Sequence, residues 1–259
     1  MSVRQPAVAG MFYPDTPAVL QRQVNDMLNS RAGAALEPKA LIVPHAGYVF
    51  SGPVAASAYR LLNPLSGRIR RVVLLGPSHR VPFRGLAAPS EDRFRTPLGE
   101  IAIDRKGIEQ LAARSLISIR SDAHELEHSL EVQLPFLQST LEDFTLLPLV
   151  VGDADANSVA DALRACWGGD ETLIVISSDL SHYHPYSEAQ QIDLATSTMI
   201  ETFDGHLTGE QACGCRAING LLALAREKQL NIATLDVRNS GDTAGDRRRV
   251  VGYGAYALY

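Results

Sequence analysis

Hydrophobic residues along the chain fall into two alternating patterns. Short continuous apolar runs, rich in β-branched residues, are typical of strands buried on both faces. These runs occupy residues 40–43, 70–76, 146–151, 172–178 and 250–258. Between them lie amphipathic segments of helical length, at residues 53–62, 107–115, 122–141, 155–167, 187–203 and 215–228. The alternation predicts an α/β fold, with a mostly parallel central sheet and helices on both of its faces.

The alternation of predicted strands and helices continues along the chain without a sign of a domain boundary. The sequence contains no low-complexity segment, no internal repeat and no Gly/Ser-rich linker. A length of 259 residues is one that α/β architectures reach as a single unit. We therefore predict one three-layer domain over residues 1–259, to which segments 84–90 and 99–104 add antiparallel strands or an excursion.

Charge and composition exclude several classes of protein. The 24 Lys and Arg residues against 29 Asp and Glu residues give a net charge of -5, which offers no basic surface for nucleic acid. The apolar runs are too short to span a bilayer, and the first residues lack the apolar core of a signal peptide. With only three cysteines a disulfide framework is not expected. These features predict a soluble cytoplasmic protein without membrane or nucleic-acid partners.

Three of the seven histidines come directly after predicted strands. His45 follows the run at 40–43, His79 follows the run at 70–76, and His182 follows the run at 172–178. In sheets of this type, ligands bind outside the carboxyl ends of the strands. Imidazole supplies the neutral nitrogen ligand that divalent transition metals prefer. The placement predicts a shared metal site, and Tyr48 is expected to line its pocket.

Cys213 and Asp179 are the further candidates for chemistry. Cys213 lies just ahead of the predicted helix at 215–228, where a thiol is ionised more easily and becomes a metal ligand or a nucleophile. The alternative is a small buried apolar side chain. Asp179 precedes His182 by three residues and is expected to orient that ring or to share a proton with it. His184 competes for the same role, and His182 is favoured because it is nearer the strand end.

A competing motif is the sequence HELEH at residues 124–128, which matches the H-E-x-x-H pattern of zinc metalloproteases. Such proteases need a third protein ligand and a catalytic Glu on a buried helix. Here the predicted helix places its apolar stripe on Leu126, Leu130, Leu134 and Leu137, with the histidines on the other side. We therefore do not favour a protease.

Five motifs, in order along the chain, carry a resemblance to a known family. They are VPHAGYVFSG (43–52), LLGPSH (74–79), EHSLEVQLPFL (127–137), SSDLSHY (177–183) and ACG (212–214). Together they resemble the Memo family, whose bacterial members are called AmmeMemoRadiSam system protein B. The resemblance covers essentially the whole chain and makes it a single Memo-like domain. It implies a fold similar to that of class III extradiol dioxygenases, which hold non-haem Fe(II) with two His and one Glu.

The resemblance also implies roles for individual residues. In the Memo pattern a Cys replaces the Glu ligand, so His45, His79 and Cys213 become the metal site. His182 becomes the residue that transfers protons, with Asp179 beside it. The family motif does not require His124, which removes the protease reading, and it places His128 and Glu131 around the metal ligands rather than among them.

Two functions follow as hypotheses. The first is a metal-dependent oxidoreductase with iron or copper, or zinc as a third candidate, acting on O2 or a small substrate. Because thiolate is a softer ligand than carboxylate, ring cleavage does not follow from the fold. The alternative is a non-catalytic binding or scaffold protein that uses the same pocket for a ligand or a phosphopeptide. The name of the system further implies companions, namely a radical-SAM enzyme and another protein of that system.

Overall fold

The centre of the fold is a row of parallel strands with buried residues on both faces. The computed structural model describes residues 2–30 and 36–259. Its innermost strands are β2 (Ala40–Val43), β3 (Arg71–Pro77), β8 (Thr145–Val151) and β9 (Thr172–Ser177), which lie in the order β8-β3-β9-β2. All neighbouring pairs in this row are parallel. Since nearly all of their residues are buried, helices must cover both faces.

Further strands extend this row into a 12-stranded sheet. On one side β12 (Val250–Leu258) runs antiparallel to β2 and also pairs with β10 (His182–His184) and β11 (Ile232–Asn239). On the other side β6 (Gly99–Ile103) joins β8, followed by β5 (Arg93–Thr96) and β1 (Val3–Arg4). β4 (Leu86–Ala88) pairs antiparallel with β8 and parallel with β7 (Ser118–Ile119). The two predicted additions at 84–90 and 99–104 are thus strands of the main sheet.

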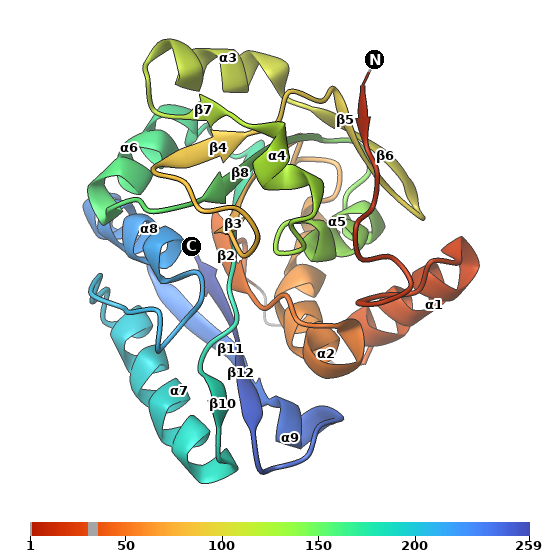
Figure 1. The fold of residues 1–259 in the computed structure, drawn as a ribbon, viewed down its shortest axis with the longest axis vertical. Helices are drawn as coiled ribbons and strands as arrows, with labels where there is room; N and C mark the ends of the chain where they lie inside the picture. The colour runs from red at the N-terminus through yellow and green to blue at the C-terminus, as the bar shows by residue number, and fades with distance from the viewer. Residues whose placement is uncertain (1, 31–35) are drawn as a thin grey trace.

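Two groups of helices lie on opposite sides of the central strands (Figure 1). One group consists of α1 (Pro17–Leu28), α2 (Tyr48–Tyr59), which continues into the 3-10 helix η1 (Arg60–Leu65), and α5 (Leu134–Thr140). The other group consists of α3 (Arg105–Ala113), α6 (Ala156–Cys166) and α8 (Cys215–Glu227). α7 (Tyr186–Glu201) packs on β11 and β12, and the short α9 (Ser240–Thr243) follows β11. The predicted single-domain, three-layer α/β fold is confirmed, whereas the exact bounds 1–259 stay a prediction.

None of the helices in the described part of the chain combines the length and apolar character needed to cross a membrane. The cytoplasmic location stays a prediction.

The single helix predicted at 122–141 is wrong. The structure has α4 (Ser121–Glu125), an irregular segment at 126–130, the 3-10 helix η2 (Glu131–Gln133) and then α5. The helix stops because the backbone N–H groups of His128 and Ser129 donate to the carboxylate of Glu127 instead of to helix carbonyls. Of the predicted apolar stripe, Leu126 is 62% exposed, whereas the other members, Leu130, Leu134 and Leu137, are buried. His124, expected on the opposite side, is 1% exposed. We call residues 126–130 the ligand loop below.

The carboxyl ends of three adjacent strands meet at one edge of the sheet. Val43 at the end of β2 lies beside Ser177 at the end of β9, and Leu75 of β3 lies beside Ile176. The segments that carry His45, His79 and His182 therefore leave the sheet at the same edge, as the sequence predicts. The prediction of a shared edge is confirmed.

Candidate metal centre

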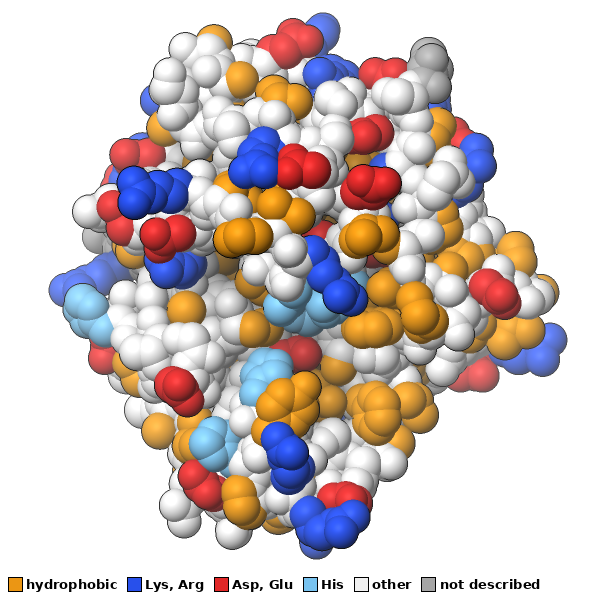
Figure 2. Space-filling model, viewed as in Figure 1, with side chains coloured by type: hydrophobic (Ala, Val, Ile, Leu, Met, Phe, Trp, Pro, Cys, Tyr) orange, Lys and Arg blue, Asp and Glu red, His pale blue; other side chains and the backbone are white. Residues whose placement is uncertain are grey.

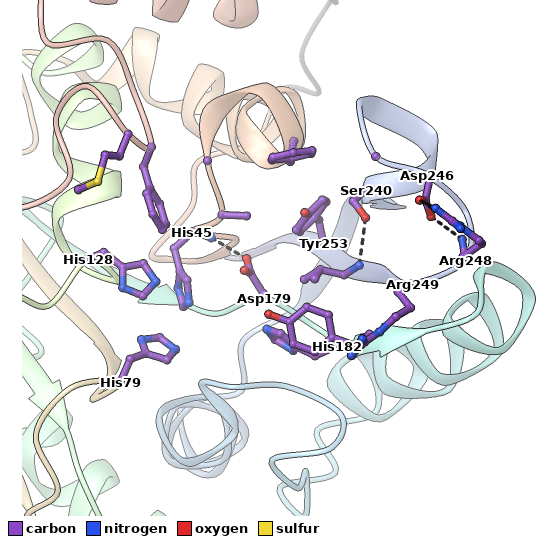
Figure 3. A pocket seen from close by; sticks show the side chains of 18 residues that line it. His45, His79, His128, Asp179, His182, Ser240, Asp246, Arg248, Arg249 and Tyr253 are labelled. Carbon is purple, nitrogen blue, oxygen red and sulfur yellow. Dashed lines mark hydrogen bonds and ion pairs between the residues drawn. The ribbon is translucent and has the colours of Figure 1, made fainter.

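Three imidazole rings converge at this edge of the sheet. Among the His, Cys, Asp and Glu side chains that the structure describes, those of His45, His79 and His128 offer ligand atoms within 4.8 Å of one another. The ring centroid of His45 lies 5.2 Å from that of His79 and 5.5 Å from that of His128. The rings of His79 and His128 stack, with their centroids 4.6 Å apart. Figure 3 shows the three rings facing one another at one end of a cavity. In Figure 2 histidine side chains gather at a hollow in the middle of the face.

Hydrogen bonds fix which nitrogen of His45 is free. Its Nδ1 lies 2.9 Å from the hydroxyl of Ser177, which donates its only proton to the carbonyl of Ser129 at 2.6 Å. The amide of Gln133 also donates to this hydroxyl, at 2.7 Å. Ser177 Oγ therefore accepts from His45, and the proton of the imidazole sits on Nδ1. The lone pair of Nε2 is left for a metal.

His79 is oriented in the same way by a carboxylate. Its backbone N–H donates to Glu127 Oε2 at 2.6 Å, and its Nδ1 lies 2.9 Å from Glu127 Oε1. Burial raises the pKa of Glu127, but the hydrogen bonds and charge of His79 outweigh it and hold that pKa at about 2. The ionised Glu127 accepts the Nδ1 proton of His79, which frees Nε2. A carboxylate behind a histidine is the arrangement that orients metal ligands.

His128 brings a buried nitrogen without a hydrogen-bond partner. Its Nδ1 is inaccessible to solvent and accepts or donates no hydrogen bond among the described residues. Burial lowers the pKa of His128 to about 4, so its ring is neutral at neutral pH. Burial, together with the charges of His79 and His128, also holds the pKa of His45 well below its ordinary value. The Nδ1 of His128 makes no hydrogen bond within the described chain and has Glu127 Oε1 nearby, at 3.4 Å. This ring, with the free Nε2 atoms of His45 and His79, fits a divalent metal.

Cys213 lies against the same His45 nitrogen. Its Sγ is 3.3 Å from His45 Nε2, close to the separation of about 3.5 Å that a sulfur and a nitrogen ligand have on one tetrahedral ion. Gly214 permits this position, because a Cβ there would lie 2.7 Å from Ser178 Cβ. Cys213 is outside the group of three histidines defined above.

The thiol is not ionised easily in the metal-free protein. Cys213 precedes the cap residue Gly214 of α8, as predicted, yet burial and then the charge of Asp179 raise its pKa to about 12. The expectation of a readily ionised thiol is therefore wrong without metal: desolvation outweighs the weak field of a helix start. Cys213 and Cys215 both line a cavity of about 430 Å³ that is separate from the one beside the histidines.

Asp179 and His182 lie next to the histidine group but are not hydrogen-bonded to each other among the contacts of the described residues. Asp179 Oδ1 instead accepts the backbone N–H of His45 at 2.7 Å. Burial raises the pKa of Asp179 to about 7, against the lowering effect of that hydrogen bond and of His79. Burial lowers the pKa of His182. Asp179 thus positions the segment of His45, and its role as orienter of the His182 ring stays a prediction.

A cavity of about 880 Å³ opens over these groups. His45, His79, His128, Asp179 and His182 all line it, along with apolar side chains that include Phe12 and Phe50. His184 does not line it and is paired with Glu188 at 2.9 Å. The cavity can hold a small molecule beside a metal and within reach of His182.

Several residues of the site differ from the expectations. Tyr48 does not line the cavity, because it is buried in the core and donates to the carbonyl of Val132. Glu131 makes no hydrogen bond or ion pair with the three histidine rings among the described residues and pairs instead with Arg4 in the core. His128, expected around the metal ligands, lies in the group of three histidines that could hold a metal ion. Strand ends do not point to His128, because it follows no strand, and only the family motif at 127–137 placed it near the metal ligands.

The HELEH motif is divided between two environments. His124 is buried in α4, where its Nε2 donates to the carbonyl of Ala87, whereas His128 faces the cavity. The ligand loop reaches the site because Gly76 leaves room on β3: a Cβ there would lie 2.8 Å from Ser129 Oγ. The two histidines therefore cannot bind one zinc ion as in a protease.

Known proteins are similar to this chain over nearly its whole length. A crystal structure of an uncharacterized protein from Escherichia coli K12 matches 83% of this chain and 98% of its own, with a TM-score of 0.49 and 13% identity, values too low to support an argument. MEMO1 family proteins from Aquifex aeolicus and Methanosarcina barkeri are each 34% identical and covered over 98% of both chains. One from Aeropyrum pernix is 35% identical, over 98% of this chain and 99% of its own. The family model described as Memo-like protein matches residues 4–257. The chain belongs to the Memo family.

Proposed function

We propose that the protein is a metal-dependent oxidoreductase whose iron or copper is bound by His45, His79 and Cys213. The observation that carries the proposal is the tautomer of His45 and His79. Each ring donates its Nδ1 proton to a fixed partner, so the lone pairs of both Nε2 atoms are free to bind a metal. The sulfur of Cys213 lies against one of these nitrogens, and His128 borders the same point from the ligand loop.

The bound metal would supply Lewis-acid and redox chemistry toward O2 or a small substrate. The chain's own residues would bind and orient the substrate and transfer protons to or from it. His182 is neutral at neutral pH and lines the cavity, so it can take a proton from a substrate held there. Asp179, with its raised pKa, is a second group on the cavity wall that can exchange a proton near neutral pH. The apolar side chains Phe12 and Phe50 exclude water from one wall.

The proposal is tested by metal analysis and oxygen uptake of protein purified without oxygen. We expect stoichiometric iron or copper in the wild type and in the control His206→Ala, which changes an exposed histidine. His45→Ala should lose the metal. His182→Ala should keep it but lose oxygen uptake with small catechols or reaction with peroxide. Loss of metal from His182→Ala would make that residue a ligand instead.

Full metal content without any turnover in the wild type would favour the binding or scaffold alternative. Zinc as the only metal would overturn the redox proposal, because zinc has no redox chemistry.

Cobalt substitution tests the sulfur ligand. Alkylation of the metal-free protein is a poor test, because the raised pKa of Cys213 makes its thiol slow to react in any case. A thiolate bound to Co²⁺ gives a strong charge-transfer band in the near ultraviolet. We expect this band in the wild type and in Cys215→Ser, and its loss in Cys213→Ser. A band that survives Cys213→Ser, or that is absent from the wild type, would remove Cys213 from the ligand set.

A further inference from the structure

The large cavity has a second end, opposite the three histidines, that carries arginine. Figure 3 shows His45, His79 and His128 at one end, Asp179 and His182 between, and Arg248, Arg249 and Asp246 toward the other. All of these residues line the same cavity of about 880 Å³. A molecule long enough to span the cavity would have one end at the histidines and the other near the arginines.

The three consecutive arginines at 247–249 differ in whether a carboxylate of the protein pairs with the guanidinium and in whether they line the cavity. Arg248 pairs with Asp246 at 2.8 Å. Arg247 lies over the ring of Tyr186, whose hydroxyl is bonded to Asp242, and it does not line the cavity. Arg249 lines the cavity, and no carboxylate of the described residues pairs with it. Its guanidinium instead lies 5.1 Å from the ring centroid of Tyr183.

The partner of Arg249 is held in a strained backbone conformation. Tyr183 has φ 63°, in the left-handed region that aromatic residues rarely adopt. It sits where the pairing of β10 with β12 shifts register between His182 and His184. A bulge of this kind re-aims a side chain next to a site. Here it leaves Tyr183 62% exposed at the cavity, against both Arg249 and the ring of His182.

From this geometry we propose that Arg249, supported by Tyr183, binds an anionic group of the substrate, and that the substrate is a small organic acid with a metal-binding end and an apolar body. The inference rests on the proposed function, which puts the metal at the histidine end. The apolar body would lie along Met11, Phe12 and Phe50, which line the same cavity. An unpaired guanidinium beside an aromatic ring is suited to a carboxylate, which it can bind with two parallel hydrogen bonds.

The experiment compares acids with their neutral amides on one protein. The probes are dihydroxyphenylacetate, dihydroxyphenylpropanoate and the primary amide of each, so that the catechol end is constant and the arm length varies. Binding to zinc-loaded protein is measured by calorimetry without oxygen, so no turnover occurs. We expect the better-fitting acid to bind about tenfold more tightly than its amide. Arg249→Gln should bring this ratio close to one, and Arg247→Gln should leave it unchanged.

An acid-to-amide ratio near one in the wild type for both arm lengths would overturn the proposal, as would a ratio that survives Arg249→Gln. Loss of the ratio in Arg248→Gln but not in Arg249→Gln would overturn the assignment to Arg249. Failure of the proposed function is a different result: it would appear as absence of metal or turnover. The acid-to-amide ratio can then still be measured on metal-free protein, because the anionic group is bound at Arg249 and Tyr183 and not at the histidines.

Discussion

Single hydrogen bonds decide the chemistry of the site at the scale of residues. A histidine can present either nitrogen, and Ser177 and Glu127 make that choice for His45 and His79. Glu127 does more, because its carboxylate also accepts the backbone N–H groups of His128 and Ser129. One buried carboxylate thus orients one ring and shapes the ligand loop that carries another.

Glu127→Gln should weaken metal binding by roughly 10- to 100-fold. The amide cannot accept from all four N–H groups, and its own NH2 group faces donors, so His79 loses its fixed tautomer. The measurement is competition with a chelator that reports metal affinity. The matched control is Glu125→Gln, two residues earlier and exposed. Equal affinities for the two variants would show that Glu127 does not orient His79.

At the scale of elements, two short segments, β10 and α4, position residues of the site. β10 is a three-residue strand with a register shift and a left-handed Tyr183. α4 is a five-residue helix that buries His124 against Ala87 and the ring of Phe94. Both flank the cavity residues, β10 by carrying His182 itself and α4 by leading into the ligand loop.

Tyr183→Gly should be more stable than Tyr183→Ala by about 1 kcal/mol. In an ordinary strand the order is reversed, because glycine loses more conformational entropy on folding. At φ 63° only glycine avoids the steric cost of the left-handed region. Urea unfolding of both metal-free variants measures the difference. An alanine variant as stable as the glycine variant would mean that this backbone conformation is not strained.

His124 should make stability fall with acidity. Burial lowers its pKa from 6.5 to about 4. Above pH 6.5 the ring is neutral in both the folded and the unfolded chain, so it has no effect. Below that pH the unfolded chain takes up a proton that the folded protein refuses until about pH 4. The free energy of unfolding therefore falls through this window, by roughly 3 kcal/mol in total.

Urea unfolding between pH 7 and pH 4 tests this contribution. The curve of His124→Gln should be flatter than that of the wild type, whereas His206→Gln, at an exposed position, should follow the wild type. Parallel curves for wild type and His124→Gln would exclude the effect.

At the scale of the whole molecule, the N-terminal segment is fastened to the loop that carries the site. Arg4, in the edge strand β1, pairs with Glu131 at 2.6 Å, and both side chains are buried. Arg4 also donates to the carbonyls of His124 and Glu127. Glu131 accepts from the N–H groups of Ala7 and Val8 and from Tyr13. The N-terminal segment at residues 4–13 and the ligand loop are therefore joined by one buried polar network.

Arg4→Ala should lower the free energy of unfolding by about 3–5 kcal/mol, because Glu131 is left as a buried charge without its partner. Arg95→Ala is the control: Arg95 pairs with Glu100 at the surface, and its loss should cost less than about 1 kcal/mol. Urea unfolding measures both. A small effect of Arg4→Ala would show that the network is dispensable.

The sequence by itself determined the central sheet and its functional edge. Apolar runs and amphipathic segments reflect burial, which is local in pattern, so they predicted β2, β3, β8, β9 and β12 and most of the helices. Parallel neighbours end at one edge, and this placed His45, His79 and His182 together. β11, with few buried residues, and α1, which buries Leu20, Val24 and Leu28 at helical spacing, were not predicted. The helix expected at 122–141 was interrupted by the polar contacts of Glu127.

Only the tertiary structure decided how the site is completed. His128 joins His45 and His79 because a loop far along the chain packs on Gly76, and no local pattern encodes that contact. The tautomers depend on Ser177 and Glu127, which come from other elements. The pKa of Cys213 depends on the burial that surrounding segments create, which reversed the expectation from its helix position. Local sequence sets what each segment can be, whereas hydrogen bonds and desolvation between distant segments set what the site can do.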